Sequence, residues 1–152
     1  MASEIDNKYL VFRVEETYAI SLAKVEKIIA YHDVTSVPET PAYIAGVINL
    51  FGHVVPVISM RTRMGKRERG MDDPAYIIIA DIDGTRLGLI VDEVLDMVVI
   101  PEETLSAPTH RATTALPLVK AIGALEDDTM VLVLDWDNLL SNDDLEQIAE
   151  TE

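Results

Sequence analysis

The chain has 152 residues, of which 49% are hydrophobic, so it is long enough for one domain or two small subdomains with a buried core. Its 12 basic and 27 acidic residues give a formal net charge of −15, which repels phosphate backbones and argues against a nucleic-acid partner. There are no cysteines, which excludes disulfides and thiolate chemistry. No apolar run approaches the roughly 18 residues of a membrane helix, and the polar, acidic start of the chain is unlike a secretory signal.

Short β-branched runs bounded by turn residues predict strands along the chain. In chain order these are Leu10–Val14, Val54–Ile58, Ile77–Ile82, Leu87–Val91 and Val131–Leu134. Asp83-Gly84 is a strong hairpin signal, because both positions of a tight β-turn need a positive φ. Pro56 has no backbone N–H and therefore predicts a sheet edge or a bulge. Many short strands with few long helical patterns favour small antiparallel barrels.

Helix is predicted only in short pieces and at the C-terminus. There Ser141 is a candidate N-cap, and Asp143 and Asp144 suit the first turn of a helix. An apolar stripe of Leu145, Ile148 and Ala149 follows. We therefore expect a short C-terminal helix and tail over residues 141–152.

One pattern occurs twice in the sequence. Residues 18–25 align without gaps on residues 87–94, and Leu50–Met60 resembles Leu125–Trp136. The strands before the first pair are aligned from Tyr9 and Tyr76, which makes the second hairpin turn two residues longer than the first. Two copies are too few for a solenoid. They predict a pseudo-symmetric pair of small barrels.

The stretch Gly46-Val47-Ile48-Asn49-Leu50, followed by Gly52 and Pro56-Val57, resembles the centre of the CheW family of coupling proteins from bacterial chemosensory arrays. Three other parts of the chain resemble that family as well: Tyr9–Val14, Val91–Val94, and Leu132–Asp135 with Leu139-Leu140. The order and spacing of these pieces cover nearly the whole chain. One family residue is missing, because Phe51 stands where the family usually has arginine.

The resemblance implies a single CheW-like domain over residues 1–152 with an all-β fold. That fold consists of two five-stranded SH3-like β-barrels in pseudo-symmetric pairing, with short helices. The repeats place the first barrel at 8–66 and the second at 75–140, with strand exchange allowed between them.

The implied function is a non-enzymatic adaptor without cofactor or metal. It would join the cytoplasmic tips of methyl-accepting chemoreceptors to the regulatory domain of a CheA-type histidine kinase. The location implied is the cytoplasm, with recruitment to membrane-associated receptor arrays.

By the same resemblance, the candidate receptor-binding residues are Val25, Lys27, Gly46 and Phe51, whereas the kinase-binding residues are not predicted. The family often has glutamate at the position of Lys27, so both members of an opposite-charge pair are replaced here. This departure leaves open whether the chain uses the usual receptor contact. Phe51 itself has two interpretations: an exposed anchor for a partner, or a ring folded back onto its own barrel.

The sequence also suggests two other functions. Asp81-Ile82-Asp83-Gly84-Thr85 spells the nucleophile motif of haloacid-dehalogenase-type phosphotransferases. In those enzymes the motif belongs to a parallel α/β sheet, whereas residues 86–91 here have the pattern of a returning hairpin strand. The other hypothesis is a detached regulatory domain of the kinase itself. The starting Met1 and the polar C-terminal tail argue against it and favour a stand-alone chain.

Three further features of the sequence are candidate functional sites: the histidines, the tryptophan and a basic cluster. His32, His53 and His110 are scattered and lack the spacing of a metal site. The spacing of Trp136 predicts a core position, with a binding role as the alternative. The basic cluster at 61–69 is either a solvated helix end or a contact for an acidic partner.

Overall fold

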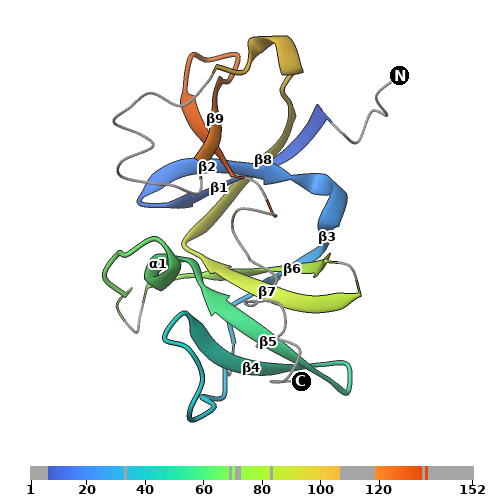
Figure 1. Ribbon diagram of the computed structural model, residues 1–152, viewed down its shortest axis with the longest axis vertical. Helices are drawn as coiled ribbons and strands as arrows, with labels where there is room; N and C mark the ends of the chain where they lie inside the picture. Colours follow the sequence, from blue (N-terminus) through green and yellow to red (C-terminus); the bar gives the residue numbers. More distant parts are fainter. Residues whose placement is uncertain are drawn as a thin grey trace. The chain divides into compact units, whose positions relative to one another are not determined.

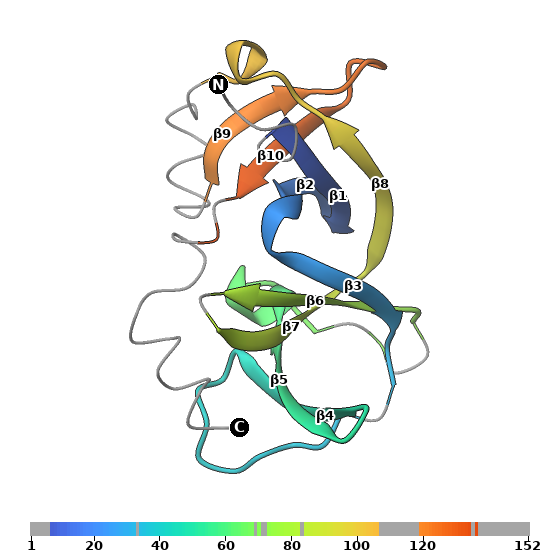
Figure 2. The ribbon, with the colours of Figure 1, turned by 90° about the vertical axis from the view of Figure 1, so that its right-hand side faces the viewer.

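The computed structural model describes residues 7–32, 34–68, 70, 73–82, 84–106, 119–134 and 136 (Figures 1 and 2). Within these residues, ten strands form two five-stranded sheets, and helix is limited to single turns. The chain divides into two compact units, each built on one sheet. The prediction of an all-β fold with two five-stranded sheets is confirmed, but the expectation of purely antiparallel barrels is wrong, because each sheet contains a parallel pair of strands. The C-terminal helix predicted over 141–152 lies outside the described residues.

The first unit has the strand order β8-β1-β2-β10-β9. Its hairpin β1–β2 is antiparallel, and β10 lies parallel to β2 and antiparallel to β9. Figure 2 shows β10 between β9 and β2. A single 3-10 turn, η3 (Glu102–Thr104), follows β8. The strands are β1 (Lys8–Val14), β2 (Glu16–Ser21), β8 (Glu93–Val99), β9 (Val119–Ala124) and β10 (Met130–Leu134).

The second unit has the strand order β3-β6-β7-β5-β4. Its hairpins β4–β5 and β6–β7 are antiparallel, and β5 lies parallel to β7. A one-turn helix, α1 (Met60–Arg63), follows β5, and a 3-10 turn, η2 (Leu22–Lys24), precedes β3. The strands are β3 (Val25–Ala30), β4 (Ile44–Leu50), β5 (His53–Ser59), β6 (Tyr76–Ile82) and β7 (Thr85–Val91).

The two strand orders correspond strand by strand. The β1–β2 hairpin takes the place of β6–β7, β10 that of β5, and β9 that of β4. The first repeat, at 8–66, contains β1–β5, and the second, at 75–140, contains β6–β10. Each sheet nevertheless combines the first hairpin of one repeat with the last three strands of the other: β1–β2 joins β8, β9 and β10, and β6–β7 joins β3, β4 and β5.

The hairpin register corrects the expected turn lengths. Val14 pairs with Glu16 across the single residue Glu15, and Ile82 pairs with Thr85 across residues 83–84. The second turn is thus one residue longer than the first, not two. Glu15 adopts φ 69°, which lets one residue reverse the chain.

Pro56 does not lie on an edge strand, because β5 is flanked by β4 and β7. It pairs with Val47 of β4, and the register with β7 begins only at Val57. A missing N–H is tolerated there, since only one neighbouring strand pairs at that point.

Each unit has a core of alternating side chains from its own sheet. In the first unit the buried cluster is Tyr9, Val11, Ala19, Ile100, Ala121, Val131 and Val133. In the second it is Ile48, Leu50, Val55, Val57, Ile77 and Ile79.

Tyr18 and Trp136 are buried in the first unit, and the polar atom of each side chain has a hydrogen-bond partner. Tyr18 stacks on Phe12 and donates its hydroxyl to Glu16 at 3.0 Å. Burial, followed by this hydrogen bond, raises the Tyr18 pKa. Trp136 is buried and donates Nε1–H to the Ser21 carbonyl at 3.1 Å, so it belongs to the core as its spacing predicted.

A pair of backbone hydrogen bonds closes each sheet beyond its regular strands. Thr35 and Val47 exchange N–H···O bonds of 2.9 and 2.8 Å in the second unit. Ser106 and Ile122 exchange two bonds of 2.9 Å in the first. In both cases the segment after an edge strand is bonded to the strand at the opposite end of the order, which closes the sheet into a barrel.

Gly46 makes the first of these closures sterically possible. A Cβ at this position would lie 2.1 Å from the Thr35 carbonyl oxygen, which is a backbone atom that cannot rotate away. Gly46 also has φ 153° and is buried. The glycine is therefore required by the close approach of two backbone segments.

We expect Gly46→Ala to lower the free energy of unfolding by about 2–4 kcal/mol, because the clash and the backbone conformation act together. Gly65→Ala is the matched control, since Gly65 has φ 73° but nothing within 4 Å of an added Cβ. It should cost only about 1 kcal/mol. Urea unfolding of both variants measures the two losses of stability. Equal losses would contradict the role of the close approach between Gly46 and Thr35.

Candidate functional site

Phe51 lies at the tip of the β4–β5 hairpin in a conformation that is unfavourable for its residue type. It has φ 51°, Gly52 has φ 86°, and Leu50 pairs with His53 across the two. Positive φ at both positions is the pattern of the tight hairpin turn in which Asn-Gly is preferred. Asn49 holds the turn, since its Oδ1 accepts the Gly52 N–H at 2.8 Å.

The Phe51 ring is exposed. It is 85% accessible, so it does not fold back into the core of its barrel. A bulky residue with positive φ costs about 1–2 kcal/mol, and an exposed ring returns little of this through burial. Local stability therefore does not explain the choice of phenylalanine at this position.

Lys27 is the residue that Phe51 contacts. The Lys27 Nζ lies 4.5 Å from the centre of the Phe51 ring, a cation–π geometry worth about 0.5–1 kcal/mol at an exposed site. Lys27 belongs to β3 and Phe51 to the β4–β5 turn, which are at opposite ends of the strand order. The contact therefore spans the closure of the barrel.

The other two predicted receptor-binding residues have different surroundings. Val25 is half-buried at the start of β3 and pairs with Ala80, just before a register shift. Gly46 is buried and serves the closure at Thr35. The structure brings Lys27 and Phe51 into contact, while a direct partner contact at Val25 or Gly46 stays a prediction.

Several residues close to the β4–β5 turn were not predicted from the sequence as part of a candidate site. Val54 is 51% exposed immediately after it, and together with His53 and Arg86 it lines a shallow pocket of about 260 Å³. Arg86 pairs with Glu26, the residue before Lys27, at 3.2 Å. Glu26 stands at the register shift between Val25 and Lys27, which no sequence pattern indicated.

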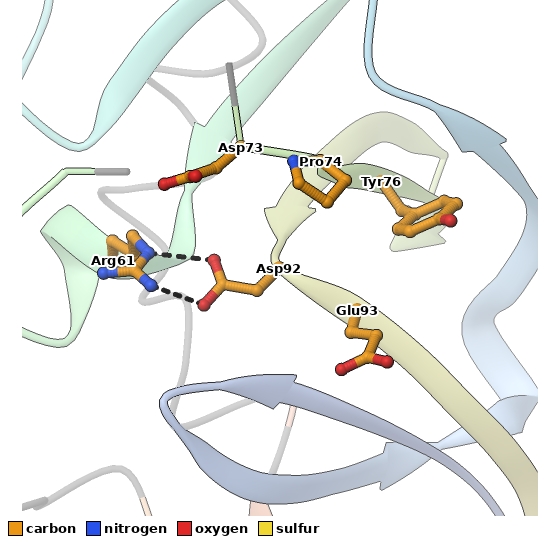
Figure 3. A pocket seen from close by; sticks show the side chains of 6 residues that line it. All are labelled: Arg61, Asp73, Pro74, Tyr76, Asp92 and Glu93. Carbon is orange, nitrogen blue, oxygen red and sulfur yellow. Dashed lines mark hydrogen bonds and ion pairs between the residues drawn. The ribbon is translucent and has the colours of Figure 1, made fainter. Parts of the chain in front are cut away.

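The basic cluster at 61–69 is largely engaged within its own unit. Arg61 donates Nε and Nη2 hydrogen bonds of 2.8 and 2.5 Å to the two carboxylate oxygens of Asp92 (Figure 3). Its Nη1 donates to the Arg67 carbonyl at 2.9 Å. Arg63 lies over the Tyr43 ring at 5.4 Å. These contacts weaken the interpretation of the cluster as a docking site for an acidic partner.

The Arg61–Asp92 pair ties α1 to the end of β7. Both side chains are mostly buried, at 18% and 22% exposure, and they line a pocket of about 370 Å³ with Asp73, Pro74, Tyr76 and Glu93 (Figure 3). A bidentate pair shielded from water is stronger than an exposed one.

We expect Arg61→Met to lower the free energy of unfolding by about 1–3 kcal/mol, because it leaves the Asp92 carboxylate partly buried and unpaired. Arg86→Met is the control. Its pair with Glu26 is longer and has exposures of 38% and 30%, so the loss should be below about 1 kcal/mol. Thermal or urea unfolding measures both, and a larger loss for Arg86→Met would overturn this ranking.

The enzyme-like motif has the wrong surroundings for phosphoryl transfer. Asp81 lies near the end of β6, which is antiparallel to β7, and its Oδ1 accepts the Gly84 N–H at 2.9 Å. The carboxylate thus organises a hairpin turn, while Asp83 lies outside the described residues. No cluster of three or more potential metal ligands occurs in the described part of the chain.

A second exposed apolar surface lies in the first unit. Leu95, Met97 and Val99 alternate along the edge strand β8, and Met130 is exposed on β10. The Asp96 carboxylate accepts the Met97 N–H at 2.8 Å. This bond satisfies one backbone donor of the edge and disfavours the addition of another strand there.

None of the described helices has the length and apolar character needed to cross a membrane. The described residues present an exposed aromatic–cation pair on a small closed barrel, which is a surface suited to contact with another molecule.

Comparisons with known proteins identify the family of this chain. The CheW-like domain model matches residues 8–144. The chemotaxis protein CheW of Klebsiella aerogenes is 31% identical over 143 residues, covering 93% of this chain and 86% of that protein. CheW of Bacillus subtilis is 40% identical over 112 residues, covering 71% and 72%. The crystal structure of the scaffolding protein TtCheW from Thermoanaerobacter tengcongensis superimposes with a TM-score of 0.78 at 32% identity, covering 91% and 95%.

The chain belongs to the CheW-like family and is a non-enzymatic coupling adaptor of chemotaxis signal transduction. The family prediction from sequence is confirmed. The phosphotransferase and detached-kinase-domain hypotheses are not favoured.

Proposed function

We propose that this chain bridges the cytoplasmic tips of methyl-accepting chemoreceptors and the regulatory domain of a CheA-type histidine kinase. It would act on the cytoplasmic side of membrane-associated receptor arrays. A change in receptor packing would reach the kinase through a shift of populations, which requires the two contacts to have different affinities in the two signalling states.

In this proposal the receptor contact is centred on Phe51 and Lys27, with Val25 and Gly46 nearby in the same unit. The observation that carries it is the exposed Phe51 ring in a positive-φ turn, with the Lys27 ammonium 4.5 Å from its centre. Exposed aromatic side chains are frequent anchors at interfaces. Because the turn is held by Asn49, the ring is presented on a defined backbone, which limits the entropy lost on binding.

We expect Phe51→Ala and Phe51→Asn to weaken binding of the receptor's cytoplasmic domain equally, by about 1–3 kcal/mol. Their stabilities should differ, because Asn tolerates the positive-φ turn and Ala does not. Phe51→Asn should therefore be more stable than Phe51→Ala by about 1 kcal/mol. Titration calorimetry and thermal unfolding measure the two quantities. If either variant retains native receptor affinity, Phe51 is not an anchor.

We expect direct binding to the regulatory domain of the CheA-type kinase from the same organism, with a dissociation constant on the order of micromolar, as for modest signalling interfaces. The supposed contact is between barrels, since the kinase domain of this family has the same double-barrel fold. Phe51→Ala should leave this affinity unchanged. Absence of heat in titrations at about 100 μM, together with a failed pull-down, would refute the kinase contact.

A further inference from the structure

Lys27 carries a positive charge that is not neutralised by the residues the structure describes. Its recorded contact is the Phe51 ring, and no carboxylate within the described part of the chain forms an ion pair with it. The adjacent Glu26 is paired with Arg86 instead. This is notable in a chain with 27 acidic residues, where an exposed lysine has many potential partners.

An aromatic ring holds an ammonium group differently from a carboxylate. The ring attracts the cation through its quadrupole but leaves the net charge unchanged. It also occupies one side of the ammonium only, so the N–H donors on the other side stay available. Lys27 is thereby positioned and remains a full cation at the surface.

The side chain recorded against Lys27 is apolar. It is the Phe51 ring, which is 85% exposed at the tip of the β4–β5 hairpin. A cation next to an exposed ring is complementary to an apolar side chain next to a carboxylate.

We propose that Lys27 and Phe51 form a recognition surface that selects a receptor tip with a carboxylate beside an apolar side chain. The apolar group of the receptor packs on the Phe51 ring, and its carboxylate pairs with the Lys27 ammonium. This inference rests on the proposed receptor contact and adds the chemistry by which one receptor is preferred. A receptor with a cation at the corresponding point is rejected by like-charge repulsion.

The charge of Lys27 has a measurable signature. The whole chain carries −15 and repels an acidic partner at long range, so a gain from Lys27 must be local. Local attraction between exposed groups is screened as the ionic strength rises. Lys120 offers a matched comparison, because it is an exposed lysine on β9 in the other unit.

The experiment measures binding of the cytoplasmic domain of the chemoreceptor from the same organism at 50 mM and 500 mM salt. Lys27→Met keeps an unbranched apolar chain against the ring but removes the charge. It should raise the dissociation constant about 5- to 10-fold at low salt and less than about 3-fold at high salt. Lys27→Glu should raise it further, and Lys120→Met should change it less than about 2-fold.

A partner-side test identifies the carboxylate. Each Asp and Glu at the receptor tip is changed to its amide, and the loss is measured against the native chain and against Lys27→Met. One receptor position should lose affinity with the native chain but not with Lys27→Met, which is the non-additivity of a direct pair.

The outcomes separate the two levels of the proposal. If Lys27→Met and Lys120→Met behave alike while Phe51→Ala weakens binding, the receptor contact stands and the carboxylate inference is wrong. The inference is also wrong if the loss in Lys27→Met is independent of salt, because Lys27 then only positions the ring. If Phe51→Ala and Lys27→Met both bind as the native chain does, the proposed receptor contact itself fails.

Discussion

The closure of a short, strongly bent sheet by two backbone hydrogen bonds is the constraint on which the second unit depends. Thr35 and Val47 can exchange these bonds only because Gly46 lacks a Cβ, which would lie 2.1 Å from the Thr35 carbonyl. A five-stranded sheet left open would expose unpaired groups on β4 and leave its core accessible to water. The same pair of bonds recurs between Ser106 and Ile122 in the first unit, so the two repeats share the way they close.

This closure also places the candidate site. Because β4 is fixed to the segment after β3, the β4–β5 turn lies where Lys27 of β3 reaches the Phe51 ring. The turn is rigid, since Asn49 caps it, and Gly52 takes the second positive-φ position without strain. Phe51 takes the first, where Asn or Gly would be more stable. A residue that is locally unfavourable and exposed is not explained by folding, and this supports the proposed role of Phe51 in binding.

The charged side chains of this protein differ in how they are paired and in how far each pair is shielded from water. The Arg61–Asp92 pair is shielded and bidentate, and it secures α1 against the end of β7. The Arg86–Glu26 pair is longer and more exposed, and it engages the acid next to Lys27. The Lys27 ammonium instead lies against an aromatic ring, in a strongly acidic chain. In the proposed receptor contact, such local differences in charge would be the means of choosing a partner.

The amino-acid sequence by itself determined the all-β class, the family, the internal repeat and the strands with a buried face, because β-branched runs and turn residues act locally. It also singled out Phe51 and Lys27, through their departure from the family pattern. It did not indicate β3 or β8 clearly, since most of their residues are exposed and show no alternation of polar and apolar side chains.

Tertiary structure alone decided that each sheet combines a hairpin of one repeat with three strands of the other, that Gly46 is a closure residue, and that Arg61 meets Asp92 at a separation of 31 residues. It also decided that Lys27 contacts the Phe51 ring across the barrel. The physical reason is that periodicity records which side chains are buried, whereas the partner of an edge strand or an exposed charge depends on how distant segments meet.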